Sequence, residues 1–322
     1  MPVECVEGNC MERQKIGIVG AGSVGATIAY ACMVRGVGRH ISIYDIAKSK
    51  VEAEVLDLNH GLMFTPETTV DGSDDLEVLS GSHVIVVTAG AKQKPGQTRL
   101  DLASTNTNIC LKLIPNLLKV APDAILLMVT NPVDVLTYIA QKISGLEARR
   151  VFGSGTVLDS SRFRFLLAQR CQVAVANVHA YIAGEHGDSE IPLWSSASIG
   201  NIPLLAWSRP HPLSDQERQS TFEQVRRAAD RVIAGKGATN YAVGLAVTAI
   251  LQAILGDEGR VLPVSSWIAD YCGLRNVCLS MPAIVNRHGV DSILPVPLND
   301  EEQTGLQASA EAILRVAHSL GF

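Results

Sequence analysis

A glycine-rich turn near the start of the chain limits the possible folds more than any other sequence feature. Residues 20–25 read GAGSVG. They follow a short apolar run, Lys15–Val19, and precede a stretch, 24–34, whose apolar residues recur at helical spacing. A second strand-like run, His40–Tyr44, is followed by Asp45, twenty residues after the last glycine of the turn. Strand, glycine turn, helix and second strand in this order predict the first unit of a doubly wound α/β fold.

The same turn has the chemistry to bind a dinucleotide. Gly20 permits the tight turn, Gly22 lets the backbone approach a pyrophosphate, and Gly25 allows close packing of helix on strand. The helix N-terminus offers free N–H groups to phosphates. Asp45 can accept hydrogen bonds from ribose hydroxyls and would repel a 2′-phosphate, and Ile46 brings no cation. We therefore expect NAD rather than NADP. The alternative is an ordinary strand–turn–helix with a solvated aspartate.

The remaining segments predict two lobes. Strand-like and helix-like runs alternate as far as residue 153, which implies a parallel sheet covered on both faces. Beyond it the pattern is mixed, with strand-like stretches at 174–183, 261–269 and 277–284 and helices at 158–171, 214–233, 241–255 and 300–318. We expect a Rossmann-type doubly wound parallel sheet with a second α+β domain. The expected boundaries are an N-terminal arm, 1–14, an NAD-binding domain, 15–153, and a substrate and catalytic domain, 154–322.

Composition excludes several classes of protein. Of the 322 residues, 47% are hydrophobic and 18% charged, which supports a large core and argues against disorder. A net charge of −5 gives no basic footprint for nucleic acid or an anionic membrane. No apolar run approaches the roughly 18 residues of a membrane span, and no signal peptide is evident. Seven scattered cysteines without a CxxC pair predict reduced thiols, no metal site and a cytoplasmic location.

Three polar residues in the second half form a candidate catalytic group. His186 lies between glycines in GEHGDS, residues 184–189, where a flexible backbone can present an imidazole for proton exchange near neutral pH. Asp159 and Arg162 are three residues apart near the start of an expected helix and so share one face. The carboxylate could orient a histidine, and the guanidinium could bind a substrate carboxylate. From spacing alone, a common surface salt bridge is the simpler interpretation.

Two loops after buried strands are expected at the ligand-binding edge of the sheet. Residues 88–100, TAGAKQKPGQTRL, are polar and glycine-rich, and could close as a lid that brings Arg99 to a reacting carbonyl. Asn131, in TNPVD, could bond to substrate or to the nicotinamide ribose. The alternatives are an ordinary surface loop and a proline chosen only to start a helix.

Taken together, these segments resemble the L-lactate/malate dehydrogenase family over nearly the whole chain. The motifs occur in the family's order: GAGSVGA, TAGAKQKPGQTRLDL, VTNPVDV, GSGTVLDSSRFR, GEHGDSE and KGATNYAVG. The resemblance implies hydride transfer between NAD and a 2-hydroxy acid. It also implies that His186 is the proton donor and acceptor, with Asp159 as its partner.

The resemblance assigns further residues to the substrate and the cofactor. Arg162 would bind the substrate carboxylate, Arg99 would polarise the C2 carbonyl, and Asn131 and Thr239 would line the substrate pocket. Val243 would pack on the nicotinamide, where the family usually has isoleucine. The remaining implied contacts to NAD are Gly20, Gly22, Val24, Gly25, Asp45, Lys50, Gly90, Ala91, Val129 and Asn131.

Gln93 favours the lactate branch of this family. Malate enzymes carry arginine at the matching position, where it pairs with the second carboxylate of their substrate. A neutral glutamine would leave that carboxylate unpaired at a cost of about 3–5 kcal/mol, although Lys92 and Lys94 flank it. The alternatives are a malate enzyme, an enzyme for larger 2-hydroxy acids, since Asn240 replaces a common aromatic, and a non-catalytic NAD-binding or structural protein on the same fold.

The resemblance also bears on assembly and regulation. Family members of this type are usually homotetramers. Arg164 and His179 match positions that bind fructose 1,6-bisphosphate between subunits in many bacterial relatives, and paired cations at a symmetry axis could bridge such an anion. Non-allosteric animal enzymes are similar at these positions, and the arm at 1–14 could stabilise the tetramer instead. Activation by the bisphosphate therefore stays open at this point.

Overall fold

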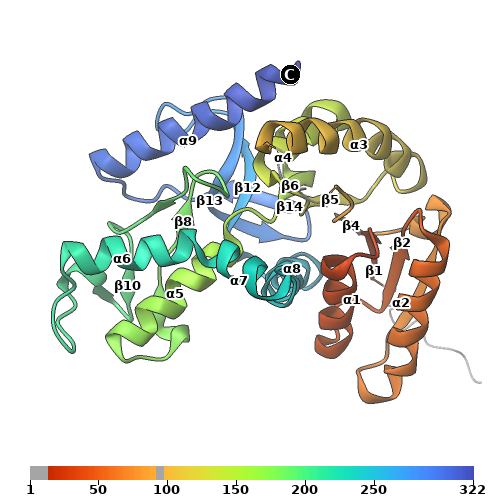
Figure 1. The fold of residues 1–322 in the computed structure, drawn as a ribbon, viewed down its shortest axis with the longest axis horizontal. Helices are drawn as coiled ribbons and strands as arrows, with labels where there is room; N and C mark the ends of the chain where they lie inside the picture. Colours follow the sequence, from red (N-terminus) through yellow and green to blue (C-terminus); the bar gives the residue numbers. More distant parts are fainter. Residues whose placement is uncertain (1–13, 92–97) are drawn as a thin grey trace, which may run out of the picture.

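Nine strands form one sheet that runs through both halves of the sequence (Figure 1). The computed structural model describes residues 14–91 and 98–322, without the side chain of Arg99. Six strands are parallel, in the order β6-β5-β4-β1-β2-β3, and β12, β13 and β14 extend the sheet antiparallel beyond β6. The strands are β1 (Lys15–Val19), β2 (His40–Tyr44), β3 (Thr69–Ser73), β4 (Val84–Val87), β5 (Ile125–Met128), β6 (Val151–Gly153), β12 (Arg260–Ile268), β13 (Val277–Asn286) and β14 (Gly289–Ile293).

The central parallel strands β4 and β5 are apolar on both sides because helices cover both faces of the sheet. All four residues of β4 are fully buried, and their side chains alternate between two cores. Val84 and Val86 pack in the core formed with α1, α2 and α8, whereas Ile85 and Val87 pack against α3 and α4. These helices are α1 (Ser23–Arg35), α2 (Lys48–His60), α3 (Arg99–Val120), α4 (Val133–Ser144) and α8 (Tyr241–Leu255). The expected doubly wound sheet is confirmed.

The second half adds helices and short strands around a further pair of cores. The helices are α5 (Val157–Cys171), α6 (Asp215–Arg226), α7 (Ala228–Lys236) and α9 (Asp300–Ser319), and the short strands are β7 (Val178–His179), β8 (Ile182–Ala183), β9 (Ile191–Pro192), β10 (Ser198–Ile199) and β11 (Ile202–Pro203). The single helix expected over 214–233 is two helices, α6 and α7. The strand-like stretch 174–183 is a 3-10 turn followed by β7 and β8. No glycine or proline within 214–233 marks that break.

The two halves of the chain share one sheet. Strand β12 pairs with β6 through Ser265 and Gly153, so the antiparallel strands of the second half continue the parallel sheet of the first. Figure 1 shows helix α8 between α1 on one side and α5 on the other, and both helices contact it. A cofactor bound at the first half can therefore meet residues supplied by the second.

The carboxyl ends of the parallel strands place the candidate site. The backbone N–H of Gly20, after β1, donates to the carbonyl of Tyr44 in β2 at 2.7 Å. The Thr88 hydroxyl, after β4, donates to the Val19 carbonyl at 2.9 Å, and the Thr130 hydroxyl, after β5, donates to that of Ala89 at 2.8 Å. These bonds hold four strand-end loops side by side.

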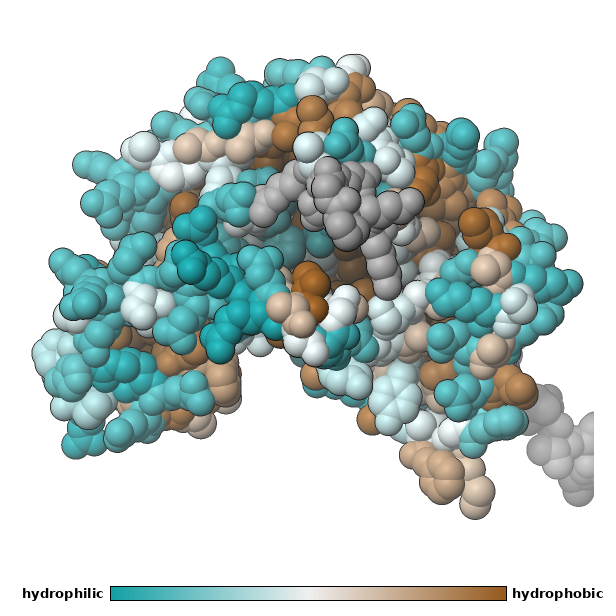
Figure 2. Space-filling model, in the orientation of Figure 1, coloured by the Kyte–Doolittle hydropathy of each residue, from teal (hydrophilic) through white to brown (hydrophobic). Residues whose placement is uncertain are grey.

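The face of the molecule shown in Figure 2 carries both polar and apolar residues. In Figure 2 polar residues cover most of the part over α5 and α6, and apolar residues show over α3 and α4. Among helices in the described ranges, none combines the length and the hydropathy that a membrane crossing requires.

Candidate active site

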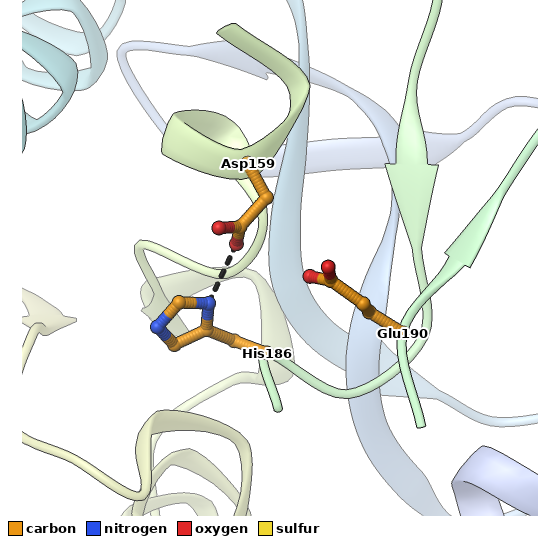
Figure 3. Close-up of side chains that lie close together, drawn as sticks. All are labelled: Asp159, His186 and Glu190. Atoms are coloured by element: carbon orange, nitrogen blue, oxygen red, sulfur yellow. Dashed lines mark hydrogen bonds and ion pairs between the residues drawn. The ribbon is translucent and has the colours of Figure 1, made fainter. Parts of the chain in front are cut away.

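His186 and Asp159 form the centre of the site. The His186 Nδ1–H donates to Asp159 Oδ2 at 2.6 Å, as the dashed line in Figure 3 marks. Asp159 lies in the first turn of α5 with 3% of its side chain exposed, and the imidazole is 27% exposed. The buried carboxylate therefore orients a ring whose other nitrogen, Nε2, is left for exchange with a ligand.

Two hydroxyl groups set the distance between these residues. The loop with His186 begins at β8, and α5 begins at Val157. Thr156 Oγ1 donates to the Ile182 carbonyl at 2.6 Å, and the Ile182 N–H donates to Ser160 Oγ at 2.8 Å. All three residues are buried. Strand β8 is thus bonded directly to the start of α5, which brings together residues 27 positions apart in the sequence.

Arg162 completes this group. Its Nη1 donates to Asp159 Oδ1 at 2.7 Å, with 16% of the Arg162 side chain exposed. Burial opposes the charge of Asp159, but the His186 imidazolium and the Arg162 guanidinium outweigh burial and hold the pKa of this carboxyl below its usual range. Asp159 therefore stays a carboxylate with both oxygens engaged by cationic partners.

The charge of Asp159 makes His186 unusually basic. The carboxylate raises the pKa of His186 to about 9, against the opposing effect of burial. At neutral pH the ring is therefore an imidazolium that can donate a proton. Sequence reasoning identified all three residues, and the structure brings them together.

Asp134 supports His186 from a third element and was missed in the sequence. It lies in the first turn of α4, 2% exposed, and its Oδ2 accepts the His186 backbone N–H at 2.7 Å. Burial raises the pKa of Asp134 to about 6, although hydrogen bonds oppose the shift. The residue belongs to the motif VTNPVDV, and its place just after a strand end was the available clue.

Glu190 is a second residue that sequence reasoning missed. It ends the loop that begins after β8, is 5% exposed, and its carboxyl points toward the Asp159–His186 pair in Figure 3. One ligand-type atom from each of the three residues lies within 4.8 Å of the others. Such a cluster suggests a metal site, but hydrogen bonds from His186 and Arg162 already occupy both oxygens of Asp159. We therefore interpret the cluster as a network for protons.

The glycine turn forms a cradle of the shape that a pyrophosphate requires. A side-chain carbon placed on Gly22 would meet no atom within 4 Å, whereas one on Gly25 would lie 1.9 Å from the Gly20 carbonyl oxygen. Helix α1 begins after Gly22, has no side-chain cap and carries no acid in its first turn. Its N-terminal N–H groups therefore have no side-chain cap and no competing acid in the first turn, which suits a phosphate.

Asp45 is bonded to this turn. Its Oδ2 accepts the Ala21 backbone N–H at 2.7 Å, and its Oδ1 accepts that of Ala47 at 2.9 Å. The carboxylate is thereby held beside the glycine turn at the end of β2, where ribose hydroxyls would bind. Lys50 lies nearby in the first turn of α2 and is exposed.

Asn106 joins the loops after β4 and β5 and was missed in the sequence. It is 1% exposed on α3. Its Oδ1 accepts the Ala91 backbone N–H at 2.7 Å, and its Nδ2 donates to the Asn131 carbonyl at 2.8 Å. A side-chain carbon on Gly90 would meet the Thr130 methyl at 2.3 Å, so the two loops approach as closely as glycine allows.

Helix α8 brings the second half to the cofactor turn. Val243 of α8 is partly buried and packs against the same hydrophobic core as Val24 and Val129. Gly244 packs on Thr27 of α1, whose methyl would lie 2.6 Å from a side-chain carbon at Gly244. Thr239 is half-buried and lies just before this helix.

Neighbouring Asn240 forms a bridge that sequence reasoning did not anticipate. Its Nδ2 donates to Thr27 Oγ1 at 3.0 Å, and its Oδ1 accepts from the Lys236 ammonium at 2.6 Å.

Some expected site residues cannot be placed. Gln93 lies outside the described residues, as does the side chain of Arg99, whose backbone begins α3. The expected effector residues are Arg164, on α5, and His179, on β7. Arg164 Nε donates to the Ala180 carbonyl at 2.9 Å and the guanidinium stacks on Tyr181, whereas His179 is exposed.

Two glycine substitutions test the cradle. Gly22→Ala should weaken NADH binding about tenfold or more, because the methyl group occupies space meant for phosphate, while the thermal unfolding temperature stays unchanged. Gly20→Ala should instead destabilise the protein by about 1–3 kcal/mol, since Gly20 has φ +106° and its side-chain carbon would meet Thr88 and Ala89. Fluorescence titration and calorimetry measure both effects. Unchanged NADH affinity in Gly22→Ala would remove the phosphate assignment.

Comparison with known proteins assigns almost the whole chain to one family. Residues 14–153 match the lactate/malate dehydrogenase NAD binding domain, and residues 156–319 match the alpha/beta C-terminal domain of the same family. The chain is 52% identical to an L-lactate dehydrogenase of Bifidobacterium animalis subsp. lactis over 311 residues, 96% of this chain and 97% of that protein. It is 47% identical to one of a Thermoanaerobacter species, covering 95% and 99% of the two chains.

Solved structures give the same result. A lactate dehydrogenase from a deep-sea metagenome library of the Medee basin superposes with a TM-score of 0.93 at 37% identity, over 97% of this chain and all of that one. The minor L-lactate dehydrogenase of Enterococcus mundtii gives 0.92 at 36% identity, over 95% and 98%. Both family domains and these full-length relatives show that the chain belongs to the lactate/malate dehydrogenase family and is an oxidoreductase that uses NAD.

Proposed function

We propose that this protein is an L-lactate dehydrogenase that interconverts pyruvate and L-lactate. The observation that carries the proposal is the buried Asp159 carboxylate held between the His186 ring, at 2.6 Å, and the Arg162 guanidinium, at 2.7 Å. This group combines a proton donor with a cation for a single substrate carboxylate. Support also comes from relatives that carry this name and match nearly the full length of the chain.

The chemistry of reduction needs a hydride and a proton. NADH, when bound, supplies the hydride to C2 of pyruvate. His186 donates a proton from Nε2 to the C2 oxygen, and Asp159 stabilises the imidazolium before the transfer. In the reverse direction the neutral ring accepts the hydroxyl proton of lactate. His186 thus holds the proton that balances the reaction, pyruvate with NADH and a proton giving lactate and NAD.

Other residues would hold the substrate in place. Arg162 binds the substrate carboxylate and keeps Asp159 ionised. In our proposal Asn131 and Thr239 line the pocket, and Arg99 polarises the C2 carbonyl. NAD is contacted by the glycine turn, Asp45 and the remaining cofactor residues named from the resemblance.

Substrate choice within the family is assigned to Gln93, which lies outside the described residues. Gln93→Arg should raise the ratio of kcat/KM for oxaloacetate to that for pyruvate about 100-fold or more, because the new cation pairs with the second carboxylate. Steady-state assays on both substrates measure the ratio. Gln97→Arg adds the same charge nearby in the segment and serves as the control. An unchanged or lower ratio in Gln93→Arg would refute the assignment.

One substrate panel tests the function itself. NADH oxidation is followed at 340 nm with pyruvate, oxaloacetate and phenylpyruvate, and NADPH is compared with NADH on the best substrate. We expect pyruvate with NADH to be fastest. Preference for oxaloacetate would indicate a malate enzyme, and preference for phenylpyruvate an enzyme for larger 2-hydroxy acids. No oxidation with any acid would indicate a binding or structural protein.

Assembly as a homotetramer is part of the proposal. Large apolar side chains are exposed on α1, α2 and the 3-10 turn after α2, a surface that a second copy would cover. They are Tyr30 (59% exposed), Val34 (51%), Leu56 (58%), Met63 (91%) and Phe64 (85%). We also propose a cytoplasmic location, which suits the free thiols of Cys32, Cys110, Cys171, Cys272 and Cys278.

The effector site at Arg164 and His179 is proposed between copies of the chain. Within one chain Arg164 already bonds to the Ala180 carbonyl, and His179 is exposed. Binding of fructose 1,6-bisphosphate there should lower the KM for pyruvate. Measurement of that KM with and without the sugar bisphosphate decides between an effector site and a surface without this role.

A further inference from the structure

Glu190 is a buried carboxyl of the catalytic centre to which the proposed mechanism gives no role. It is 5% exposed, and among the described residues its Oε1 has no hydrogen-bond partner. Pairing of β8 with β9, Ala183 opposite Ile191, closes the loop that carries His186 and returns the chain to Glu190. The hairpin thus places this carboxyl beside the Asp159–His186 pair, toward which it points (Figure 3).

The groups that face Glu190 come from three elements. Asp159 and Arg162 lie on α5, His186 on the same loop, and Arg226 on α6. Burial and the negative charge of Asp159 raise the pKa of Glu190 to about 8, while the three cationic groups oppose the shift. Glu190 is therefore mainly a neutral acid at neutral pH and becomes a carboxylate in mildly alkaline solution.

We propose that Glu190 is a positioning residue of this centre, and that the loss or retention of its proton controls how firmly His186 keeps the proton used in catalysis. The inference rests on the proposed function of His186. As a carboxylate, Glu190 adds a negative charge that stabilises the imidazolium; as a neutral acid it does not. His186 already has Asp159 on α5 and Asp134 on α4 as acidic neighbours. Glu190 adds an acid whose charge changes in the pH range just below that in which His186 loses its proton.

The consequence is a wider pH range for pyruvate reduction. As pH rises, Glu190 ionises first and its charge delays the loss of the His186 proton, because an opposite charge within about 4–6 Å favours the charged form. A neutral residue of the same size at this position would remove the delay. The proton would then leave His186 at lower pH, which disfavours reduction and favours lactate oxidation.

The experiment compares Glu190→Gln with the wild type, both as full-length protein. Glutamine matches the size of the neutral acid, so folding should be retained. The His186 ring is followed by NMR on histidine-labelled protein and assigned by its absence in His186→Asn. We expect its titration midpoint to fall by about one pH unit. The alkaline limb of kcat/KM for pyruvate reduction should move by the same amount, and lactate oxidation at neutral pH should rise relative to reduction.

Glu302→Gln is the matched control. Glu302 is also a glutamate that is 5% exposed, but its carboxylate accepts the backbone N–H groups of Ser195 and Asn299 at the start of α9. The same chemical change there should leave the His186 titration in place. An equal shift in both variants would show a general effect of lost charge and overturn the proposal.

Two further outcomes keep this inference separate from the proposed function. An unmoved His186 titration in folded Glu190→Gln overturns the inference while pyruvate reduction by the wild type stands. A shifted titration in a protein that never oxidises NADH with pyruvate supports the coupling and rejects the function. If Glu190→Gln does not fold, the NMR titration of His186 in the wild type tests the proposal instead. Two coupled groups should give a two-step titration of His186. A single step would overturn the proposal.

Discussion

Replacement of His186 by asparagine is expected to reduce kcat for pyruvate reduction by about 10²–10⁴-fold, the usual contribution of a positioned proton donor. Asparagine can still accept or donate a hydrogen bond, but it has no proton to give at neutral pH. The affinity for NADH should stay within about twofold, since the glycine cradle and Asp45 lie on the first half of the chain. Stopped-flow kinetics and NADH fluorescence measure the two quantities separately.

The pH dependence of activity tests whether the loss in His186→Asn comes from the missing proton donor. The pKa of His186 is raised to about 9 by Asp159, so the wild type should reduce pyruvate steadily at neutral pH and lose kcat/KM as pH rises through about 9, where the ring becomes neutral. Lactate oxidation requires the neutral ring and should rise over the same range. His186→Asn should lack both changes. His60→Asn, at an exposed histidine that ends α2, is the control and should keep them. Activity at the wild-type level in His186→Asn would exclude this residue as proton donor.

Arg162→Leu is expected to reduce kcat/KM for pyruvate by about 100-fold or more, because removing one partner of a buried charge pair costs about 2–5 kcal/mol. The loss has two sources. The substrate carboxylate no longer meets a guanidinium, and Asp159 loses the hydrogen bond to its Oδ1. Most of the effect should appear as a higher KM for pyruvate, with NADH binding unchanged. Steady-state kinetics and isothermal titration with oxamate measure it.

Two further variants serve as controls for Arg162→Leu: lysine at the same position, and leucine at a second arginine of α5. Arg162→Lys keeps a positive charge beside Asp159 but lacks the planar pair of donors, so it should recover only part of the loss. Arg170→Leu removes a guanidinium from the same helix, where it pairs with Glu217, and should leave the pyruvate KM unchanged. A normal KM for pyruvate in Arg162→Leu would place the substrate carboxylate elsewhere.

The first half of the fold could be predicted closely from local pattern. Strands β1 and β2 occur at the expected residues, since continuous apolar runs are typical of strands buried on both faces. Strand β3, TVDGS, was missed because it is an edge strand with polar residues. Strand β14, GVDSI, was missed for the same reason, since it ends the sheet on the other side. Edge strands have fewer neighbours and need less hydrophobic surface, so their sequences carry a weaker pattern.

The candidate site also has one part that local sequence predicts and another that depends on the fold. Asp45 and the glycine turn depend on spacing along one short segment, and the sequence alone indicated their roles. The group around His186 depends on distances between segments, as its bond to Asp159 spans 27 positions and its bond to Asp134 spans 52. Spacing alone left Asp159 and Arg162 as an ordinary surface pair, and only the family's motifs favoured a catalytic role.

By itself, then, the sequence determined the doubly wound sheet, the dinucleotide turn and the order of the motifs, because helix and strand periodicities and glycine turns are local properties of the chain. Only the tertiary structure decided that β12 continues the sheet, that Asn106 joins two loops, and that Asp134 and Glu190 lie beside the His186–Asp159 pair. The burial of these groups, and therefore their charge, depends on atoms from distant segments that pack around them. No spacing along the chain encodes that environment.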